Sequence, residues 1–285
     1  IGAMIDFEPL LANPKLIFFG AAAQLGIFIT LIIATLLKFN LNDAASIAMI
    51  GAADGPTAIL VANVLNSKYT GAIVVVAYSY MALVPIVQPA VIKLVTTKKE
   101  RKIRMAYSPK QVSKTAKIIF PIVVTLIAGI IAPQSVALVG FLMFGNLIRE
   151  CGVLDTLSET AQSTLVNLIT LLLGISISFN MQAESFLTWE VLIIVGLGLA
   201  AFVFDTIGGI MLAKIINLFT KNKINPMVGA AGISAFPMSA RVVQKLGLEA
   251  DPENHLLMHA VSANVSGQIA SVLAGGIILS IIALL

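Results

Sequence analysis

Charged residues are scarce in this sequence of 285 residues: 11% are charged, whereas 58% are hydrophobic. Soluble domains carry about 25% charged residues, because a surface that faces water must be hydrated. A chain with so little charge cannot cover such a surface, so its outer face must contact lipid. The strict alternation of an outer-membrane barrel is also lacking, which leaves helices as the spanning structure. The composition therefore predicts an all-α polytopic membrane protein.

Other classes of protein are excluded by what is missing. The single cysteine, Cys151, rules out an intrachain disulfide. No phosphate-binding loop, nucleophile elbow or pair of catalytic carboxylates is present, so ATP-driven transport within this chain is unsupported. His255 and His259 are four residues apart, but no third ligand lies nearby, which favours packing over a metal site. The chain opens at Ile1 in a stretch typical of the end of an earlier element, so we expect N-terminal helices to be missing.

Long apolar segments follow one another along the chain, and a spanning helix needs about 20 such residues. We expect about eight or nine transmembrane or re-entrant helices. The segments are 16–38, 44–65, 71–95, 118–132, 136–149, 161–179, 189–217, 225–246 and 256–285. Segment 136–149 is short for a span.

A basic loop at 98–117 separates a first part, 1–97, from a second part, 118–285. It carries eight Lys or Arg residues against one acid, Glu100. Loops rich in Lys and Arg remain on the cytoplasmic side of a membrane, so this loop is predicted to be cytoplasmic. A patch for nucleic acid or anionic lipid is the alternative, but topology is a sufficient explanation of the charge.

An internal repeat relates the two parts. Residues 50–65 are IGAADGPTAILVANVL and residues 228–243 are VGAAGISAFPMSARVV. Both have Gly and Pro inside an apolar segment, so 44–65 and 225–246 are predicted to be broken helices, in repeats within 1–97 and 189–285. Paired breaks of this kind indicate a transporter's binding site, the alternative being kinks relieved by neighbouring helices. Counting every segment as a full span makes the repeats parallel, unless 136–149 does not cross or one broken segment is re-entrant.

Asp54 is the one acid between Ala44 and Lys68, and it lies at the first break. A charged side chain at mid-membrane costs about 2.5–3.5 kcal/mol on insertion scales, so something must compensate it. The sequence Asp-Gly-Pro-Thr also fits an N-cap, with Pro56 just inside the following half-helix. Serine would cap at lower cost in lipid, so we favour a cation at Asp54.

The second broken segment offers neutral oxygens, which suit sodium beside one carboxylate. They are the side chains of Asn225, Ser234 and Ser239 and the carbonyl groups near Gly229 and Gly232. Arg241 follows, either as a residue reaching for the membrane edge or as a clamp for a carboxylate, and the sequence does not decide between them.

Several aromatic and amide residues in the neighbouring segments have a less specific pattern. Tyr78 and Tyr80 are most simply packing or interfacial residues. Asn264 and Ser266 either line a pathway or join helices by hydrogen bonds.

The motifs GAADGPTAI, AYSYMALVP, LMFGNLIRE and NPMVGAAGISAFPMSARVVQK occur in an order that resembles the beta subunit of the sodium-pumping, biotin-dependent decarboxylases. That family includes oxaloacetate, methylmalonyl-CoA and glutaconyl-CoA decarboxylases, and the resemblance covers essentially the whole chain. Its members are longer at the N-terminus by several helices. The resemblance implies that Asp54, Tyr78, Tyr80, Asn225, Gly229 and Ser234 belong to the sodium site and that Arg241 has a functional role.

The resemblance also implies a mechanism. Carboxybiotin, carried on a partner, docks on the cytoplasmic side, loses CO2 and takes up a proton, while sodium bound at Asp54 moves outward. Arg241 and Asp54 are the expected catalytic residues, and Arg241 is expected to bind carboxybiotin. Expected partners are an alpha carboxyltransferase subunit, a biotin carrier and a small gamma-type membrane subunit, with a homo-oligomer within the complex in the bacterial inner membrane. An ordinary sodium-coupled transporter or Na+/H+ antiporter is the rival interpretation, and the acid that is decarboxylated is left open.

Overall fold

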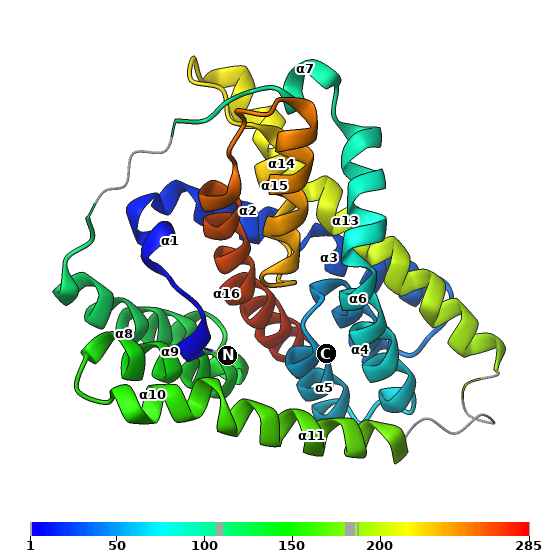
Figure 1. Ribbon diagram of the computed structural model, residues 1–285. Coiled ribbons are helices and arrows are strands. Elements are labelled where there is room, and N and C mark those ends of the chain that lie inside the picture. The colour runs from blue at the N-terminus through cyan, green and yellow to red at the C-terminus, as the bar shows by residue number, and fades with distance from the viewer. Residues whose placement is uncertain (1, 107–110, 180–185, 187, 285) are drawn as a thin grey trace.

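The computed structural model describes residues 2–106, 111–179, 186 and 188–284, and these form helices without any strand (Figure 1). The predicted all-α membrane class is therefore confirmed. Among these residues, six helices are long and apolar enough to span a membrane. They are Pro14–Leu36 (which joins η2, α2 and α3), α6 (Thr70–Val95), α8 (Lys114–Ile131), Asp155–Phe179 (α10 and α11), α13 (Trp189–Phe219) and α16 (Leu257–Ile282). The predicted count of eight or nine is not confirmed.

The three remaining apolar segments are shorter or interrupted. Segment 136–149 forms α9 (Val136–Cys151), after the 3-10 helix η4 (Pro133–Ser135). Segment 44–65 is divided into α4 (Leu41–Ala48), η3 (Met49–Ala52) and α5 (Gly55–Val64). Segment 225–246 is divided into α14 (Pro226–Ala230) and α15 (Met238–Ala250). The prediction that these last two segments are broken is confirmed.

The first broken segment returns to the end of the molecule at which it begins. The Asn42 side-chain amide donates to the Leu65 carbonyl at 3.3 Å. The Asp43 carboxylate accepts from the Ser67 hydroxyl at 2.7 Å and from the Lys68 backbone N–H at 3.2 Å. These bonds join the start of α4 to the residues after α5. Residues 41–67 therefore form a re-entrant hairpin, called hairpin 1 below.

The second broken segment folds back in the same way. The side-chain amides of Asn225 and Asn254 both donate to the carbonyl of Arg101, at 3.0 and 2.8 Å. Asn225 precedes α14 and Asn254 follows α15, so the two ends of this segment meet at one atom. Residues 225–254 form hairpin 2. Its base is held by the basic loop, which includes α7 (Lys98–Arg101).

The two hairpins enter from opposite ends of the molecule. Helices α6 and α13 run in the same direction, because Tyr80 donates to the Val195 carbonyl and Lys214 to the Val95 carbonyl. Hairpin 1 precedes the start of α6, whereas hairpin 2 follows the end of α13. In Figure 1, α7, α14 and α15 accordingly gather at the top and α5 lies at the bottom.

The broken helices are therefore inverted rather than parallel, in agreement with the alternative that a broken segment is re-entrant. The physical reason is that neither broken segment crosses the membrane: with both re-entrant, each contributes no crossing. Each hairpin arm is short, since the 13 residues of α15 extend about 20 Å at 1.5 Å per residue. That is enough to reach beyond the middle of a hydrocarbon core about 30 Å thick, but not to span it.

Helices α13 and α16 are the most buried of the six long helices, and they lie between the hairpins. The segment with α8, α9, α10 (Asp155–Gln162) and α11 (Thr164–Phe179) lies at one side and beneath them (Figure 1). The 3-10 helix η1 (Gly2–Met4) packs on α9, and α1 (Glu8–Ala12) packs on α16. No residue of α11 is buried, and its exposed side chains are largely apolar. Such a surface suits lipid.

Candidate functional site

Asp54 lies at the tip of hairpin 1, between η3 and α5. The chain reaches it through Ala53 in the left-handed conformation, and Asp54 itself is extended, so the carboxylate leaves the helix axis. Its Oδ2 accepts from the Thr57 hydroxyl at 2.7 Å and from the Ser271 hydroxyl of α16 at 3.2 Å. Within the described residues, no Lys or Arg forms an ion pair with it. The negative charge is thus surrounded by neutral hydroxyls.

Ser234 lies at the tip of hairpin 2 and contacts the tip of hairpin 1. Its hydroxyl donates to the Ala52 carbonyl, and its own carbonyl accepts from the Gln268 side chain. Ala52 is two residues before Asp54, so the two breaks meet inside the molecule. Ser234 is 2% exposed, which places this junction away from solvent. The structure therefore brings together the breaks that the sequence repeat pairs.

One face of α16 completes the junction. Asn264, Gln268 and Ser271 are spaced by four and three residues and so share a helix face. The Asn264 amide donates to the Ile233 carbonyl at 2.6 Å, and its buried Oδ1 has no partner in the described part of the chain. Sequence reasoning missed Thr57, Gln268 and Ser271. The polar spacing in α16 was the signal that could have found two of them.

A cavity of about 210 Å³ adjoins Asp54. Its polar lining comes from Asp54, Thr57 and Gln268, and its apolar lining from η1, α9 and α16. No cluster of three or more His, Cys, Asp or Glu residues occurs in the described part of the chain. One carboxylate with several hydroxyl and carbonyl oxygens is instead a set of hard ligands that suits an alkali cation.

The two predicted tyrosines have different surroundings. Tyr78 packs against Gly55, where a Cβ atom would collide with the tyrosine ring, so this phenol lies beside the residue that follows Asp54. Tyr80 points to α13, where its hydroxyl donates to the Val195 carbonyl at 2.5 Å and its ring packs on Gly198. Tyr78 is therefore near the tip of hairpin 1, and Tyr80 joins α6 to α13.

Asn225 and Gly229 lie in the other arm of hairpin 2. The Asn225 side-chain Oδ1 caps α14 by accepting from the Met227 N–H at 3.0 Å, and the side-chain amide donates to the Arg101 and Ile103 carbonyls. Gly229 packs backbone to backbone on Gly209 of α13, where a Cβ on either glycine would overlap the other's carbonyl oxygen. These contacts position hairpin 2. None of them joins these two residues to Asp54.

Arg241 lies in α15 with an exposed side chain. It forms no ion pair with any described residue. With Gln244, Lys245 and Leu248, it lines an open hollow on the outer face of α15. Arg241 is thus on hairpin 2, but it is not among the residues that contact Asp54.

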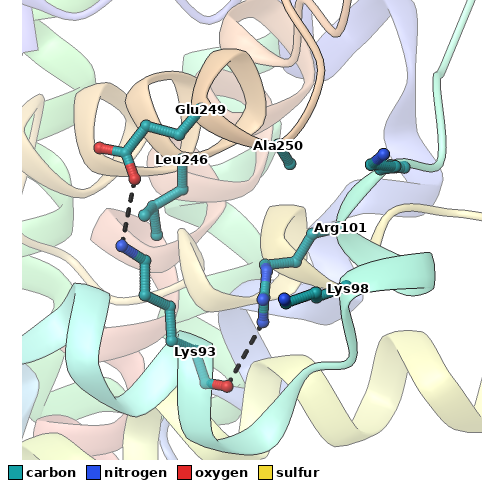
Figure 2. A pocket seen from close by; sticks show the side chains of 7 residues that line it. Lys93, Lys98, Arg101, Leu246, Glu249 and Ala250 are labelled. Carbon is teal, nitrogen blue, oxygen red and sulfur yellow. Dashed lines mark hydrogen bonds and ion pairs between the residues drawn. The ribbon is translucent and has the colours of Figure 1, made fainter.

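A second hollow, of about 250 Å³, lies at the base of hairpin 2 (Figure 2). Four cationic side chains line it, together with Glu249: those of Lys93, Lys98, Arg101 and Lys102. Lys93 pairs with Glu249 at 3.1 Å, and Arg101 donates to the Lys93 and Thr96 carbonyls at 3.3 and 2.6 Å. Residues 98–103 of the basic loop therefore cover the base of hairpin 2, and they leave a surplus of positive charge there.

Two inverted re-entrant hairpins that meet at an intramembrane carboxylate are the arrangement of ion-translocating membrane proteins. A family model described as the Na+-transporting oxaloacetate decarboxylase beta subunit matches residues 1–282. The chain belongs to this family.

Curated relatives agree with this assignment. The chain is 50% identical over 288 residues to an oxaloacetate decarboxylase beta chain of Haemophilus ducreyi, covering 99% of this chain and 66% of the relative. It is 51% identical over 283 residues to a methylmalonyl-CoA decarboxylase subunit beta of Propionigenium modestum, covering 99% and 71%. It is 48% identical over 282 residues to a glutaconyl-CoA decarboxylase subunit beta of Acidaminococcus fermentans, covering 99% and 75%. The chain thus spans between two thirds and three quarters of the length of these relatives.

Proposed function

We propose that this chain is the membrane subunit of a sodium pump driven by a biotin-dependent decarboxylase. Decarboxylation of carboxybiotin on a partner would be coupled to outward Na+ movement, with uptake of a proton. The observation that carries the proposal is the Asp54 carboxylate, held at the junction of two hairpins by the Thr57 and Ser271 hydroxyls. Its charge has no protein counter-ion in the described residues, and membership of a Na+-transporting family favours sodium as the cation.

The inverted hairpins suggest how access to the ion changes sides. Hairpin 2 enters from the end that carries the basic loop, which the positive-inside rule makes cytoplasmic. Hairpin 1 enters from the opposite end, and the tips meet at the bond between Ser234 and the Ala52 carbonyl. Displacing hairpin 2 would expose Asp54 to the cytoplasm, and displacing hairpin 1 would expose it to the outside. Coupling requires that carboxybiotin favour one of these states over the other.

Arg241 is the residue we assign to carboxybiotin. Its guanidinium is exposed on α15 and offers the two parallel hydrogen bonds that a carboxylate accepts. Because α15 is an arm of hairpin 2, a ligand held there acts on the hairpin whose tip contacts the ion site. Asp54 would receive the proton when sodium leaves.

The partners follow from the same proposal. A carboxyltransferase alpha subunit, a biotin carrier and a small gamma-type subunit would bind this chain, which would form a homo-oligomer in the bacterial inner membrane. The basic end of hairpin 2 is a suitable face for the carrier, since carboxybiotin is an anion. Which acid is decarboxylated depends on the alpha subunit, and the three relatives differ in this respect.

The test is sodium uptake into inverted vesicles that contain the purified complex. We expect uptake on addition of the substrate acid, and its loss when avidin blocks biotin. Uptake that is insensitive to avidin and is driven by a proton gradient alone would reject the pump and support an ordinary antiporter. Family membership does not favour that alternative.

A further inference from the structure

Asp205 is a second buried acid that the proposed mechanism does not use. It lies in the middle of α13 and is 1% exposed. Its Oδ1 accepts from the Gly26 backbone N–H at 2.6 Å. Gly26 belongs to the first turn of α3 (Leu25–Leu36), which follows a break after α2 (Ile17–Ala22). The carboxylate therefore meets the positive end of a half-helix.

The other oxygen of Asp205 has no hydrogen-bond partner in the described residues and is buried. It faces hairpin 1, because a Cβ placed on Gly51 would lie 2.9 Å from Oδ2. Gly51 is in η3, three residues before Asp54. Thr30 lies one turn beyond Gly26 on the same face of α3, and its hydroxyl is also buried without a partner. Asp205 Oδ2 and the Thr30 hydroxyl, where α3, η3 and α13 pack together, thus have no hydrogen-bond partner in the described residues.

No Lys or Arg of the described residues forms an ion pair with Asp205. The sequence of η2, α2 and α3 has no ionisable residue between Lys15 and Lys38, and η3 and α14 have none. Helix α6 presents Tyr78 and Tyr80 to this region, and the acids of hairpin 1 are Asp43 and Asp54. An isolated carboxylate in the membrane interior is costly unless a cation neutralises it. The backbone N–H groups of Gly26 and Ile27 interact with the carboxylate, but they bring no positive counter-ion.

Burial alone is not the signal, as Asp43 shows. Asp43 is 2% exposed, but its carboxylate accepts from the Ser67 hydroxyl and the Lys68 N–H at the base of hairpin 1. No oxygen of Asp43 is among the buried atoms that lack a partner. Asp43 is thus the matched control for Asp205: it is similarly buried, but it has no buried oxygen without a partner.

We propose that Asp205 is a second monovalent-cation site, at the crossing of α3, η3 and α13, separate from Asp54. The cation is H+ or Na+, which neutralise a carboxylate in the same way. The Asp205 Oδ2 binds it, and the Thr30 hydroxyl contributes a neutral oxygen when the cation is sodium. Because the site contacts the segment that leads to Asp54, its occupancy is linked to the conformation of hairpin 1.

The experiment is equilibrium binding to the purified complex in detergent, without turnover, so that it is independent of the decarboxylase proposal. The starting variant is Asp54→Asn, which removes the first site. Binding of radioactive sodium is measured at constant ionic strength, and melting temperature is measured between about pH 6 and 9. For sodium at Asp205, we expect residual binding that weakens at least about tenfold in Asp54→Asn/Asp205→Asn. For a proton, we expect a melting temperature that falls with rising pH, and a smaller fall in the double variant.

Two further variants keep the result interpretable. Asp43→Asn in the Asp54→Asn background should leave the residual sodium binding and the pH dependence of the melting temperature unchanged. Where it lowers the melting temperature itself, it does so by the same amount at every pH. Thr30→Val keeps the shape of the side chain but removes its hydroxyl. It tests the sodium alternative in case Asp205→Asn does not fold, and we expect residual sodium binding to weaken severalfold. The proposal is overturned when the Asp205→Asn double variant matches Asp54→Asn in both measurements. It is equally overturned when Asp54→Asn retains no sodium binding and its melting temperature is independent of pH.

Discussion

Hairpin 1 and hairpin 2 have related sequences but different attachments. Hairpin 1 carries the charge, and its base is closed by its own residues, Asn42 and Asp43 bonding to the chain after α5. Hairpin 2 has a neutral tip, and its base is closed by the backbone of the basic loop, at the Arg101 carbonyl. A partner that binds the basic loop can therefore act on hairpin 2 without touching hairpin 1. Under the proposed function, hairpin 1 supplies the charged ligand of the ion, whereas hairpin 2 supplies neutral oxygens and responds to the partner.

The largest effect should come from the charge on hairpin 1. We expect Asp54→Asn to abolish sodium-dependent decarboxylation by the purified complex, while the subunit remains inserted and folded. Asp54→Glu should retain little activity, because one more methylene displaces the oxygens by about a carbon–carbon bond in a site that tolerates about 0.5 Å. Normal sodium-stimulated turnover in Asp54→Asn would remove hairpin 1 from the mechanism.

The next effect tests the long arm of hairpin 2. Arg241→Ala and Arg241→Lys should both severely slow decarboxylation of free carboxybiotin at saturating sodium, because lysine keeps the charge but loses the paired hydrogen bonds. Lys245→Ala is the control, since Lys245 lies one turn further along the same exposed helix. Wild-type rates in Arg241→Lys would show instead that Arg241 reaches for the membrane edge.

A smaller effect separates the tip of hairpin 2 from its base. Ser234→Ala should raise the sodium concentration for half-activation, because an unmade bond at a buried site costs about 1–3 kcal/mol, or about 5- to 150-fold. The sequence assigns Asn225 to the same ion site, but its hydrogen bonds lie at the basic loop. Asn225→Ala should therefore lower thermal stability with a smaller shift in half-activation. Equal shifts in the two variants would place Asn225 at the ion.

The tyrosines give a similar contrast within α6. Tyr80→Phe removes a buried bond to the Val195 carbonyl and should cost about 0.5–1.5 kcal/mol of stability. Tyr78→Phe should leave stability nearly unchanged but alter sodium half-activation, since Tyr78 packs beside Asp54. Thermal melting and sodium titration of both variants check this, and a reversed pattern would assign Tyr80 to the ion site.

The smallest effect concerns the base of hairpin 2 in acid. Hydrogen bonds from Arg104 lower the pKa of the Asp251 carboxyl, which lies just after α15. A lowered pKa in the folded state means that this contact stabilises at neutral pH and is lost as the pH falls through that pKa. Protease cleavage of the basic loop should therefore increase only below about pH 4, beneath the ordinary pKa of an aspartate. Asp251→Asn should cleave readily at all pH values, and a pH response unchanged by it would assign the effect elsewhere.

The sequence was sufficient to predict the all-α membrane class, the two helix breaks and Asp54 as the candidate ion-site acid, because each of these has a local cause. Apolar segments predict helices, Gly and Pro predict interruptions, and one acid in an apolar segment stands out. The local pattern left re-entry as one of two alternatives, because the choice depends on bonds between residues far apart, such as Asn225 with Arg101.

The residues that form the candidate ion site were only partly predictable, again because they are brought together by contacts between distant parts of the chain. Ser234 lies at the tip of hairpin 2 and Tyr78 of α6 packs beside the tip of hairpin 1, whereas Asn225 and Gly229 lie in an arm of hairpin 2. Gln268 and Ser271 come from α16, which lies outside both broken segments. Asp205 is also an acid inside an apolar segment, but that segment has no predicted break, and nothing in the sequence indicates that the break before α3 lies against it.

The contact between Gly209 and Gly229 limits how hairpin 2 can move. Two backbones in direct contact have no side chains that can yield by changing rotamer, so α14 and α13 must be displaced as one body. Bending of hairpin 2 is then confined to residues 231–237, between α14 and α15. Ser234 lies in this short stretch. Ser234, which we propose at the ion site, is therefore part of the segment that bends. Bending residues 231–237 and breaking the contact between the two hairpin tips are then a single motion.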